Sequence, residues 1–540
     1  MKRRGTRTGA KALVESLERA GVEVLFGYPG GNVIDIFDEI PSGRFDFVLG
    51  RHEQGCVHMA DGYARALGRP GVVVVTSGPG LTNTITGLGT ANMDGVPLVV
   101  ICGQVPLDQI GTDAFQEADT TGLTRAVSKH NFLVHSADEI PETIAQAFYI
   151  ATHGKPGPVV IDIPRDIQVE KTAAEYPERV VLRSYHPEST ATTSQVNRLA
   201  KLLNEAKRPL IYAGGGVIAA DAAEDVRALA EKASVPVVTT LMGIGAADAA
   251  DPLALGLAGL HGTPVANAAV ARADVILALG VRFNDRVTGA ASKFAPKAKI
   301  VHVDCDPASI NKNVSVHLGI VADVKDLLAT VNSRIRASDR PAWRGEIAAW
   351  RKAAAHEPKR GVCSPPEVIA ALARACTGDE RIVTDVGQHQ IWAAKGFPHR
   401  SPRHFISSGG MGTMGFGIPA AIGVAIAKPG EKVIAVLGDG GAQMTFEELI
   451  VAAERRLPIV FVILKNGTLG LVRQMQRREK GGRFVAIDLG SPDFVKLAAA
   501  YGMKAVRVAD GAKLDAVVAK AVKSRVPVVV EVEVAKEAEA

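Results

Sequence analysis

The stretch LGDGGAQMTFEELIVAAERRLPIVFVILKNGTLG, residues Leu437 to Gly470, places a helical segment between two apolar strands. We expect the first strand to end at Gly438-Asp439-Gly440, a helix to begin near Thr445, and the second strand to deliver Asn466, 27 residues after Asp439. Apolar strands joined by a helix are typical of parallel sheets that are covered on both faces. This stretch therefore predicts an α/β fold.

The same alternation of short β-branched runs and helical segments continues along the chain and divides it into three units. We expect doubly wound parallel-sheet domains at residues 1–175, 195–335 and 362–540. A polar segment at residues 171–194 is interpreted as a linker, and a charged stretch at residues 336–361 separates the second unit from the third. The strands are expected at residues 22–26, 72–76, 98–102, 159–163, 210–213, 237–240, 275–279, 300–304, 382–385, 433–437, 459–464 and 528–534.

Composition limits the class of function. Of 540 residues, 47% are hydrophobic and 22% charged, and the net charge is only +5, which favours a small-molecule enzyme over a nucleic-acid-binding protein. The five cysteines show no C-x-x-C spacing, so neither a structural zinc site nor a disulfide framework is expected. The basic start leads into an amphipathic helix, unlike a signal peptide, and the apolar runs are only of strand length. We expect a cytoplasmic protein without a membrane contact.

The ends of the two strands in the first stretch form a candidate metal site. Parallel strands end at the same edge of a sheet, so the Asp439 carboxylate and the Asn466 amide oxygen can meet on one ion. These hard oxygen ligands suit Mg²⁺, which commonly shares its coordination shell with phosphate oxygens. Gly438, Gly440 and Gly441 would let backbone N–H groups approach a diphosphate. Gly-Asp-Gly alone is more often a simple turn, and the spacing to Asn466 is what favours the site.

This segment resembles the thiamine-diphosphate motif, which opens with GDG and closes with a pair of Asn residues. Here Lys465 replaces the first Asn, whereas Asn466, the metal ligand of the pair, is kept. The resemblance implies that the third protein ligand is the backbone carbonyl of Thr468.

A second motif, RHEQGCVHMADGYAR at Arg51 to Arg65, offers the carboxylate of Glu53 just after a strand. Taken alone, Glu53 is more often a helix N-terminal carboxylate stabilised by the helix dipole. Together with VTSGPGLTN at Val75 to Asn83, however, the motif resembles the pyrimidine-binding domain of thiamine-diphosphate enzymes. The resemblance implies that Glu53 hydrogen-bonds the pyrimidine ring nitrogen.

Within that superfamily the chain resembles the catalytic subunits of acetolactate (acetohydroxyacid) synthases over nearly its whole length. The most specific stretches are DAFQE, at residues 113–117, and RFNDRVTG, at residues 282–289. The resemblance implies a reaction pocket lined by Gly31, Phe115 and Gln116, with Arg165 at its rim where a Lys is usual. It also implies that Gly387, Gln388 and His389 approach the diphosphate and that Gly412 and Met414 contact the aminopyrimidine. Taken alone, Met414 would more often be a residue that fills the hydrophobic core, and His389 a polar residue with its hydrogen bonds made.

The middle unit resembles the flavin-binding domain of the same family. Glycines at strand ends suit a dinucleotide pyrophosphate, and Asp304 could bond a ribose hydroxyl. No G-x-G-x-x-G is present in this unit, and Asn284 replaces a usual Asp. We expect FAD in a structural role, contacted by Gly215, His261, Arg282, Arg286 and Asp304.

The resemblance implies a transferase that decarboxylates pyruvate on thiamine diphosphate and ligates the hydroxyethyl unit to pyruvate or 2-ketobutyrate, in isoleucine and valine biosynthesis. It also implies a homodimer or homotetramer and allows a small regulatory subunit. Met475 replaces a Trp associated with 2-ketobutyrate preference, which leaves the acceptor open. The alternatives are a related 2-keto-acid decarboxylase or lyase, a pyruvate oxidase, and a catalytically silent binding subunit. Retention of Glu53, Asp439 and Asn466 argues against the last.

Overall fold

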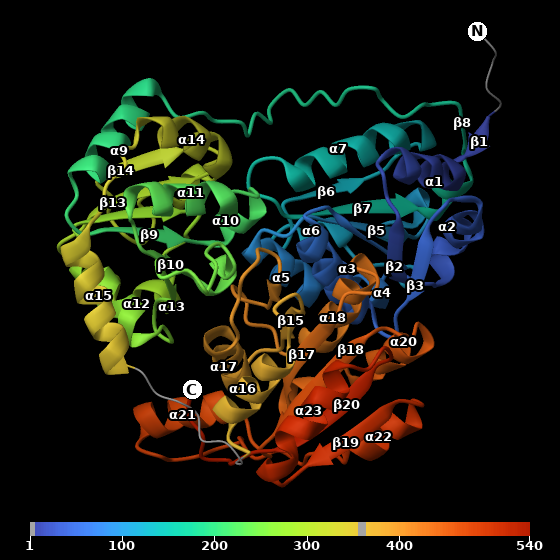
Figure 1. Cartoon of the computed structure of the whole chain (residues 1–540). Helices are drawn as coiled ribbons and strands as arrows, with labels where there is room; N and C mark the ends of the chain where they lie inside the picture. Colours follow the sequence, from blue (N-terminus) through green and yellow to red (C-terminus); the bar gives the residue numbers. More distant parts are fainter. Residues whose placement is uncertain (1–5, 355–362) are drawn as a thin grey trace.

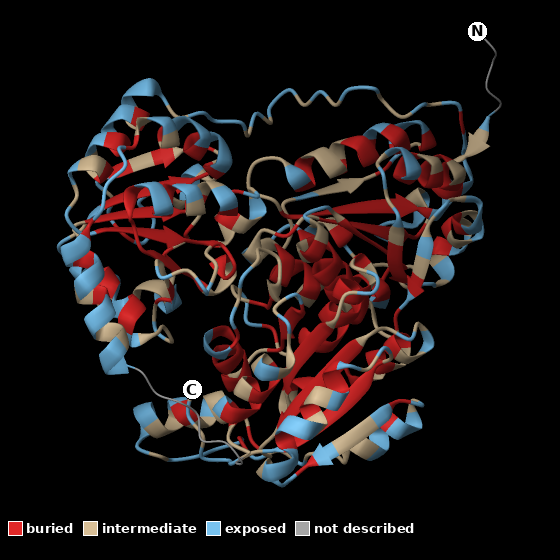
Figure 2. Cartoon of the chain, in the orientation of Figure 1, coloured by how far each residue is buried: buried red, intermediate tan, exposed pale blue. Residues whose placement is uncertain are grey.

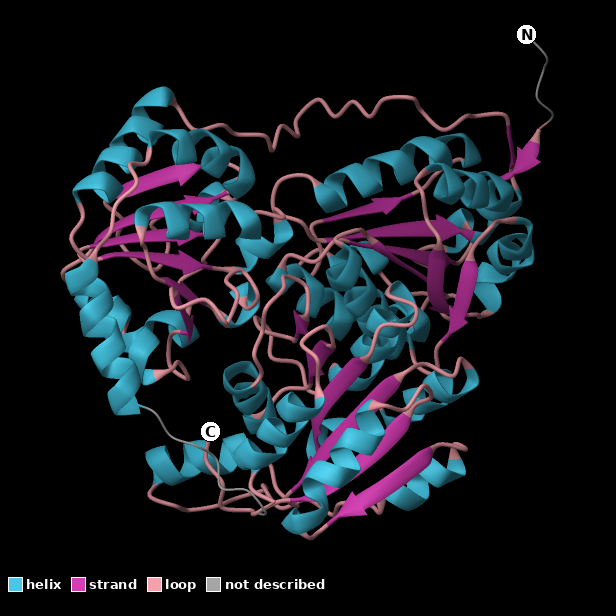
Figure 3. Ribbon diagram, viewed as in Figure 1, coloured by secondary structure: helices cyan, strands magenta, loops and turns pink. Residues whose placement is uncertain are grey.

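The computed structural model describes residues 6–354 and 363–540, which form three six-stranded parallel sheets with helices on both faces (Figures 1 and 3). The predicted α/β class is confirmed. The first five residues of the basic start, the charged stretch from residue 355, and the predicted start of the third unit at residue 362 lie outside the described residues. Within the described part, no helix is both long and apolar enough to cross a membrane.

The first sheet has the strand order β3-β2-β4-β5-β7-β6. Its strands are β2 (Val24–Tyr28), β3 (Asp46–Leu49), β4 (Gly71–Val75), β5 (Leu98–Gln104), β6 (His130–Leu133) and β7 (Pro158–Pro164). Its helices are α1 (Gly9–Arg19), α2 (Ile34–Glu39), α3 (Glu53–Leu67), α4 (Pro79–Thr82), α5 (Ile85–Asp94), α6 (Thr120–Thr124), α7 (Ile140–Thr152) and α8 (Arg165–Val169). The short strands β1 (Arg7–Thr8) and β8 (Lys171–Thr172) pair antiparallel beside it.

The middle sheet has a different order, β11-β10-β9-β12-β13-β14. Its strands are β9 (Pro209–Ala213), β10 (Val237–Thr239), β11 (Ala254–Leu257), β12 (Val275–Leu279), β13 (Lys299–Asp304) and β14 (Leu318–Val321). Its helices are α9 (Thr193–Glu205), α10 (Gly215–Ala219), α11 (Ala223–Ala233), α12 (Pro264–Arg272), α13 (Asp285–Thr288), α14 (Val324–Val331) and α15 (Pro341–Ala354). An extended segment between β8 and α9 leads into this unit along the top of Figure 1.

The third sheet, β16-β15-β17-β18-β20-β19, repeats the order of the first. Its strands are β15 (Arg381–Thr384), β16 (Phe405–Ile406), β17 (Val433–Gly438), β18 (Ile459–Lys465), β19 (Lys504–Val508) and β20 (Val528–Glu533). Its helices are α16 (Pro365–Ala375), α17 (Gln388–Gly396), α18 (Gly417–Ala427), α19 (Asp439–Met444), α20 (Leu449–Glu454), α21 (Gly470–Lys480), α22 (Phe494–Ala500) and α23 (Leu514–Val522).

Burial on both faces explains why the central strands read as unbroken apolar runs. In β4, Val73 and Val75 belong to one core cluster and Val72 and Val74 to the cluster on the opposite face. Figure 2 shows the sheets as buried layers under partly exposed helices. Such two-sided burial is what a parallel sheet requires.

The first and third units share one core. Helices α3 and α18 pack so closely that a Cβ on Gly62 would lie 2.2 Å from the Ala420 carbonyl oxygen, and one on Gly423 would lie 1.8 Å from the Met59 carbonyl oxygen. Only glycine allows the two backbones to come this near. The buried cluster that results extends from Phe26 of β2 to Phe461 of β18.

One expectation about local structure is wrong, and a second stretch contains a helix that was not expected. The helix expected near Thr445 begins six residues earlier, at Asp439, and Thr445 instead interrupts it with φ −142° and ψ 30°. The charged stretch at residues 336–361 does more than separate units, because it contains α15, whose buried Trp343 donates a hydrogen bond to the Pro209 carbonyl at 3.1 Å. An apolar face with Trp343 and Ile347 at helical spacing packs on the middle unit despite the surrounding charge.

Candidate functional site

The first unit presents Glu53 at the carboxyl edge of its sheet. Glu53 is the first residue of α3, and its Oε2 accepts a hydrogen bond from Asn83 Nδ2 at 2.9 Å. A Cβ on Gly80 would lie 3.7 Å from Glu53 Oε1 and 2.7 Å from the Thr76 methyl group. The glycines of the SGPG turn therefore leave space beside a carboxylate whose position Asn83 fixes.

The other predicted pocket residues surround the same edge. Gly31 follows β2, and a Cβ there would meet nothing within 4 Å. Gln116 has φ 62° and its carbonyl oxygen would lie 2.8 Å from a Cβ on Gly78, so the DAFQE loop packs against the SGPG turn. Phe115 is 88% exposed. Arg165 begins α8 and pairs with Asp35 at 3.5 Å.

The third unit holds Asp439 at the end of β17 and Asn466 just after the neighbouring strand β18. Asp439 Oδ2 accepts hydrogen bonds from Gly467 N at 2.7 Å and Ser491 Oγ at 2.8 Å, and Asn466 Oδ1 accepts one from Thr468 N at 3.0 Å. Among the described residues, no three His, Cys, Asp or Glu side chains are grouped to hold a metal ion. The predicted set is of another kind, with one carboxylate, one amide oxygen and one carbonyl.

Gly387, Gln388 and His389 lie beside this metal candidate. Cβ atoms on Gly387 and Gly438 would lie 2.8 and 2.9 Å from His389 Cε1, so the imidazole covers both glycines. Burial lowers the pKa of His389 to about 4, so the ring is neutral at pH 7, and its Nε2 has no partner among the residues that the structure describes. The Gln388 amide lies near Asn466, since both would be within 3.0 Å of a Cβ on Gly470.

A buried carboxylate that sequence reasoning missed, Asp385, holds the adjoining loop. It accepts hydrogen bonds from Gly415 N at 3.0 Å, Gly417 N at 2.9 Å and Val386 N at 2.7 Å. Burial raises the pKa of Asp385 to about 6 despite these donors. Its place at the end of β15 was the available signal. In this loop the Met414 methyl group would lie 3.3 Å from a Cβ on Gly440, beside the Gly-Asp-Gly turn.

Glu53 and Asp439 face different surroundings within one chain. The third-unit carboxylate that reaches the start of α3 is Glu448, which accepts hydrogen bonds from Arg51 N at 3.0 Å and His52 N at 3.0 Å. Asp439 instead bonds Gly467 and Ser491 of its own unit. Within one chain, a group of the first unit thus holds Glu53 and groups of the third unit hold Asp439.

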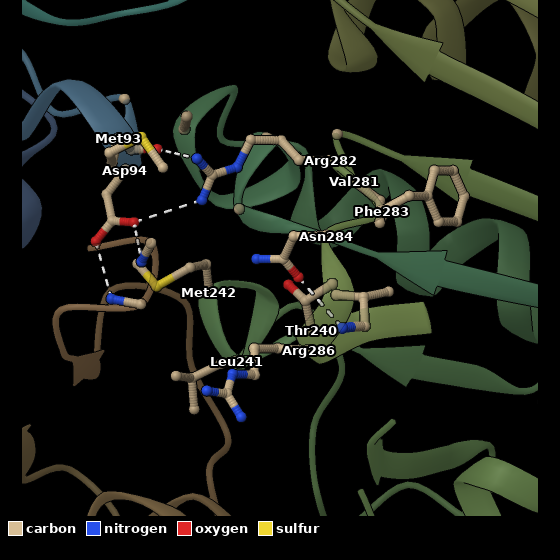
Figure 4. A pocket seen from close by; sticks show the side chains of 18 of the residues that line it. Met93, Asp94, Thr240, Leu241, Met242, Val281, Arg282, Phe283, Asn284 and Arg286 are labelled. Carbon is tan, nitrogen blue, oxygen red and sulfur yellow. Dashed lines mark hydrogen bonds and ion pairs between the residues drawn. The ribbon is translucent and has the colours of Figure 1, made fainter. Parts of the chain in front are cut away.

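The middle unit contributes most of a cavity of about 610 Å³, whose other walls come from the first and third units (Figure 4). The cavity opens at the carboxyl ends of β9 and β12, the strands between which the sheet order reverses. All five predicted flavin contacts line it, namely Gly215, His261, Arg282, Arg286 and Asp304. Gly412 of the third unit lies on the same wall as Met411.

Charged and polar groups are spread around this cavity. Arg282 donates to the Met93 carbonyl and pairs with Asp94 at 3.6 Å, as Figure 4 shows. Burial raises the pKa of Asp304 to about 6, while burial and nearby cations lower that of His261. Asn284 caps α13 by accepting from Val287 N at 3.2 Å, a bond that the usual Asp would also make.

Two departures from the family pattern lie at the edge of the site. The Lys465 ammonium donates to the Pro492 carbonyl at 3.0 Å and lies 3.4 Å from the buried Glu531 carboxylate. Lys465 thus bonds groups other than the predicted metal ligands. Met475 lies on α21 and is 41% exposed.

Comparisons with known proteins find similarity over nearly the whole chain. Three family models match: thiamine pyrophosphate enzyme N-terminal TPP binding domain at residues 7–123, central domain at 196–331, and C-terminal TPP binding domain at 385–532. The acetolactate synthase large subunit of Haemophilus influenzae is 45% identical over 94% of this chain and 91% of its own length. The isozyme 3 large subunit of Escherichia coli is 44% identical over 95% and 92%, and a probable large subunit of Methanocaldococcus jannaschii is 44% identical over 97% and 91%.

Proposed function

The chain belongs to the acetolactate synthase large subunits of the thiamine pyrophosphate enzyme family, and we propose that it decarboxylates pyruvate and joins the two-carbon unit to a second 2-keto acid. The product from two pyruvates is 2-acetolactate, a step of branched-chain amino acid synthesis. The observation that carries this proposal is the similarity over nearly the whole chain to relatives of that name.

The residues of the third unit fit thiamine diphosphate. Gly387 and Gly438 would let backbone N–H groups approach a diphosphate, and the buried His389 Nε2, which has no partner among the described residues, could contact it. Met414, packed toward Gly440, and Gly412 would support the aminopyrimidine. When bound, the cofactor supplies the carbanion chemistry that makes decarboxylation and carbon–carbon bond formation possible.

Asp439, Asn466 and the Thr468 carbonyl would hold Mg²⁺ against the diphosphate. Asp439 and Asn466 follow adjacent strands, β17 and β18, and supply the hard oxygen ligands that Mg²⁺ prefers. The Ser491 hydroxyl and the Gly467 N–H fix the Asp439 carboxylate from behind. Hydrogen bonds of this kind, made to a metal ligand by groups that do not touch the metal, orient the ligand before the metal binds.

Glu53 would hydrogen-bond the pyrimidine ring nitrogen and exchange a proton with it. Asn83 holds one carboxylate oxygen, which leaves Oε1 on the side of the open SGPG turn. Gly31, Gln116 and the exposed Phe115 line that edge and would form the wall of the keto-acid pocket. Arg165, half-exposed at the rim, offers a cation to a substrate carboxylate.

The middle cavity would hold FAD. The sheet order of this unit, 3-2-1-4-5-6 in chain order, is that of dinucleotide-binding folds, and the cavity lies at its switch point. Arg282 and Arg286 suit a pyrophosphate, and Asp304 suits a ribose hydroxyl. The family resemblance gives this flavin a structural role.

Two identical chains would form the minimal active species. Glu53 belongs to the first unit and Asp439 to the third, and the family resemblance implies that these two units of one site come from different chains. Specific activity should then fall on dilution unless cofactor holds the dimer together, by mass action. Light scattering combined with activity would test this, and a fully active monomer would contradict it. The relatives are named large subunits, which supports a small regulatory subunit as a further partner.

Product analysis with pyruvate alone tests the proposed reaction. The chain is incubated with pyruvate, thiamine diphosphate and Mg²⁺, with and without FAD, and the products are identified by mass spectrometry. Acetolactate is expected. Acetaldehyde would indicate a simple decarboxylase, acetate or acetyl phosphate an oxidase, and no product a silent subunit. Asp439→Ala, which removes a proposed metal ligand, is the negative control.

A further inference from the structure

The loop at residues 407–414, which carries Gly412 and Met414, is held from outside its own unit. Gly409 N donates to Asp94 Oδ2 at 3.0 Å, and Gly410 N donates to Asp94 Oδ1 at 2.7 Å. Asp94 is the last residue of α5 in the first unit. One carboxylate thus binds two successive amide groups of a loop more than 300 residues away in sequence.

The Asp94 carboxylate contacts all three units. Its side chain is fully buried, and Arg65 of α3 pairs with it at 2.9 Å while also pairing with Asp61. Arg282 of the middle unit lies 3.6 Å from Oδ1 and donates to the neighbouring Met93 carbonyl (Figure 4). A buried charge is stable only when it is paired and hydrogen-bonded, so these partners hold one another in place.

Packing at the same point leaves little free volume. A Cβ on Gly410 would lie 2.7 Å from Asp94 Oδ1 and 3.0 Å from the Arg282 guanidinium. A Cβ on Gly409 would lie 2.3 Å from the sulfur of Met242, which lines the middle cavity. A displacement of the Arg282 side chain therefore also displaces the 407–414 loop, and a displacement of the loop also displaces Arg282.

We propose that Asp94 is a positioning residue that couples the middle cavity to the thiamine site, so that a flavin dinucleotide bound beside Arg282 strengthens thiamine diphosphate binding. This inference rests on the proposed function, which assigns the cavity to the flavin and the 407–414 loop to the aminopyrimidine. A ligand that fixes Arg282 also fixes Asp94 and the Gly409 and Gly410 amides. The second ligand then binds a loop that the first ligand has already ordered. Its binding no longer includes the free-energy cost of ordering the loop, which gives positive coupling. The coupling also gives a flavin without a redox step a role in this enzyme.

The test measures two affinities and their mutual dependence. Thiamine diphosphate is titrated at fixed Mg²⁺ by tryptophan fluorescence, with and without saturating FAD, and FAD is titrated by its own fluorescence, with and without thiamine diphosphate. In the wild type, each ligand should lower the dissociation constant of the other by about fivefold or more, and the factor should be the same for both ligands. For each ligand, the ratio compares its dissociation constant without and with the other ligand. Asp94→Asn should reduce both ratios to about one. Arg282→Gln should do the same, and the double variant should show no further loss.

Three further variants keep the outcome clear. Gly410→Ala retains every charge but forces a methyl group between Asp94 and Arg282, so it should also lower the ratio, even if Asp94→Asn does not fold. Asp38→Asn, an exposed site on α2, should leave the ratio unchanged. Asp61→Asn, which removes the other partner of Arg65, should lower thermal stability yet retain the coupling. A purely structural role for Asp94 would likewise lower stability without changing the ratio.

The failures of this inference and of the proposed function are distinguishable. If the wild type binds both ligands with coupling and Asp94→Asn or Gly410→Ala keeps the ratio, the role of Asp94 is refuted while the proposed function stands. If the wild type binds both ligands independently, the coupling itself is refuted. If it binds thiamine diphosphate but no FAD, the flavin assignment is wrong and the coupling falls with it.

Discussion

Glu448 provides a pH-dependent test of how the third unit supports the helix that carries Glu53. Its carboxylate is fully buried and accepts hydrogen bonds from Arg51 N and His52 N, the two residues before Glu53. Burial raises the pKa of Glu448 from its ordinary 4.5 to about 7, and the backbone donors offset only part of this effect. The folded protein therefore binds the Glu448 proton more tightly than the unfolded chain does.

The sign of the pH effect follows from this difference. The stability that Glu448 contributes is fully present below its unfolded pKa of 4.5 and is lost as the pH rises through the folded pKa of about 7. At about 1.4 kcal/mol for each pKa unit, the whole rise corresponds to about 3 kcal/mol, of which about 2 to 3 kcal/mol is lost between pH 5 and pH 8.

Glu448→Gln removes this titration and keeps an amide oxygen to accept from the same backbone groups. The unfolding free energy of the variant minus that of the wild type should increase by about 2 to 3 kcal/mol from pH 5 to pH 8. Urea unfolding followed by circular dichroism at both pH values measures it, and the subtraction cancels the titration of groups common to both proteins.

Glu454→Gln is the matched control, because Glu454 pairs with the Arg51 side chain at 2.7 Å but is 54% exposed. Exposed ion pairs contribute little to stability, so its difference from the wild type should be small at both pH values. If the Glu448→Gln difference does not change between pH 5 and pH 8, Glu448 is ionised throughout and the argument from burial is wrong.

The remaining predictions concern the cofactor and the acceptor. Glu53→Gln should keep thiamine diphosphate affinity but lower turnover by about 10²- to 10⁴-fold, because an amide cannot exchange the proton; unchanged hydrogen exchange at thiamine C2 would remove Glu53 from this role. Asp439→Ala should weaken Mg²⁺ and thiamine diphosphate together, since the metal joins protein and diphosphate. Cofactor titration at fixed Mg²⁺ measures this, and unaltered affinity would move the metal site elsewhere. Met475→Trp should shift products toward 2-aceto-2-hydroxybutyrate by about tenfold when pyruvate and 2-ketobutyrate compete, because a rigid aromatic face favours the extra methylene of 2-ketobutyrate. A wild type that already prefers 2-ketobutyrate strongly, or a variant without a shift, would show that other residues set the acceptor.

Strands buried on both faces could be predicted from the sequence, whereas the edge strands β6 and β19 could not. The run predicted at residues 275–279 coincides with β12, because every residue there is buried and apolar. By contrast, β19 (Lys504–Val508) and β6 (His130–Leu133) are half-exposed edge strands that carry polar residues, so their apolar pattern is weak. The start of α19 was missed because Gly-Asp-Gly-Gly has a low intrinsic helix propensity, which tertiary contacts of Gly441 with Asp385 override.

Candidate metal ligands could be proposed from the sequence, whereas carboxylates that bind backbone amides could not. Asp439 and Asn466 are recognisable because two strand ends and a fixed spacing bring them together. Asp94 and Asp385 bind N–H groups of glycines that belong to another unit or to a distant loop. A glycine has no side chain to reveal such a partner, so only the folded chain identifies these carboxylates.

The order of strands gives all three units a reversal of chain direction at the same relative place in the sheet. In each sheet the first strand lies between neighbours to which the chain proceeds in opposite directions, β2 beside β4, β9 beside β12, and β15 beside β17. The loops that leave these pairs diverge and open a crevice at the carboxyl edge. Topology thus sets the position of each site, and side chains set its chemistry. Glu53, the proposed proton-exchanging carboxyl group, follows β3, the neighbour of β2. The proposed metal ligands Asp439 and Asn466 follow β17 and its neighbour β18, and Arg282, the proposed cation for a dinucleotide, follows β12. The first and third sheets share one order and one core. The middle sheet has cores of its own, and its unit contacts Asp94 of the first unit through Arg282. In the proposed coupling, a ligand bound in the middle unit would act on the thiamine site through this contact.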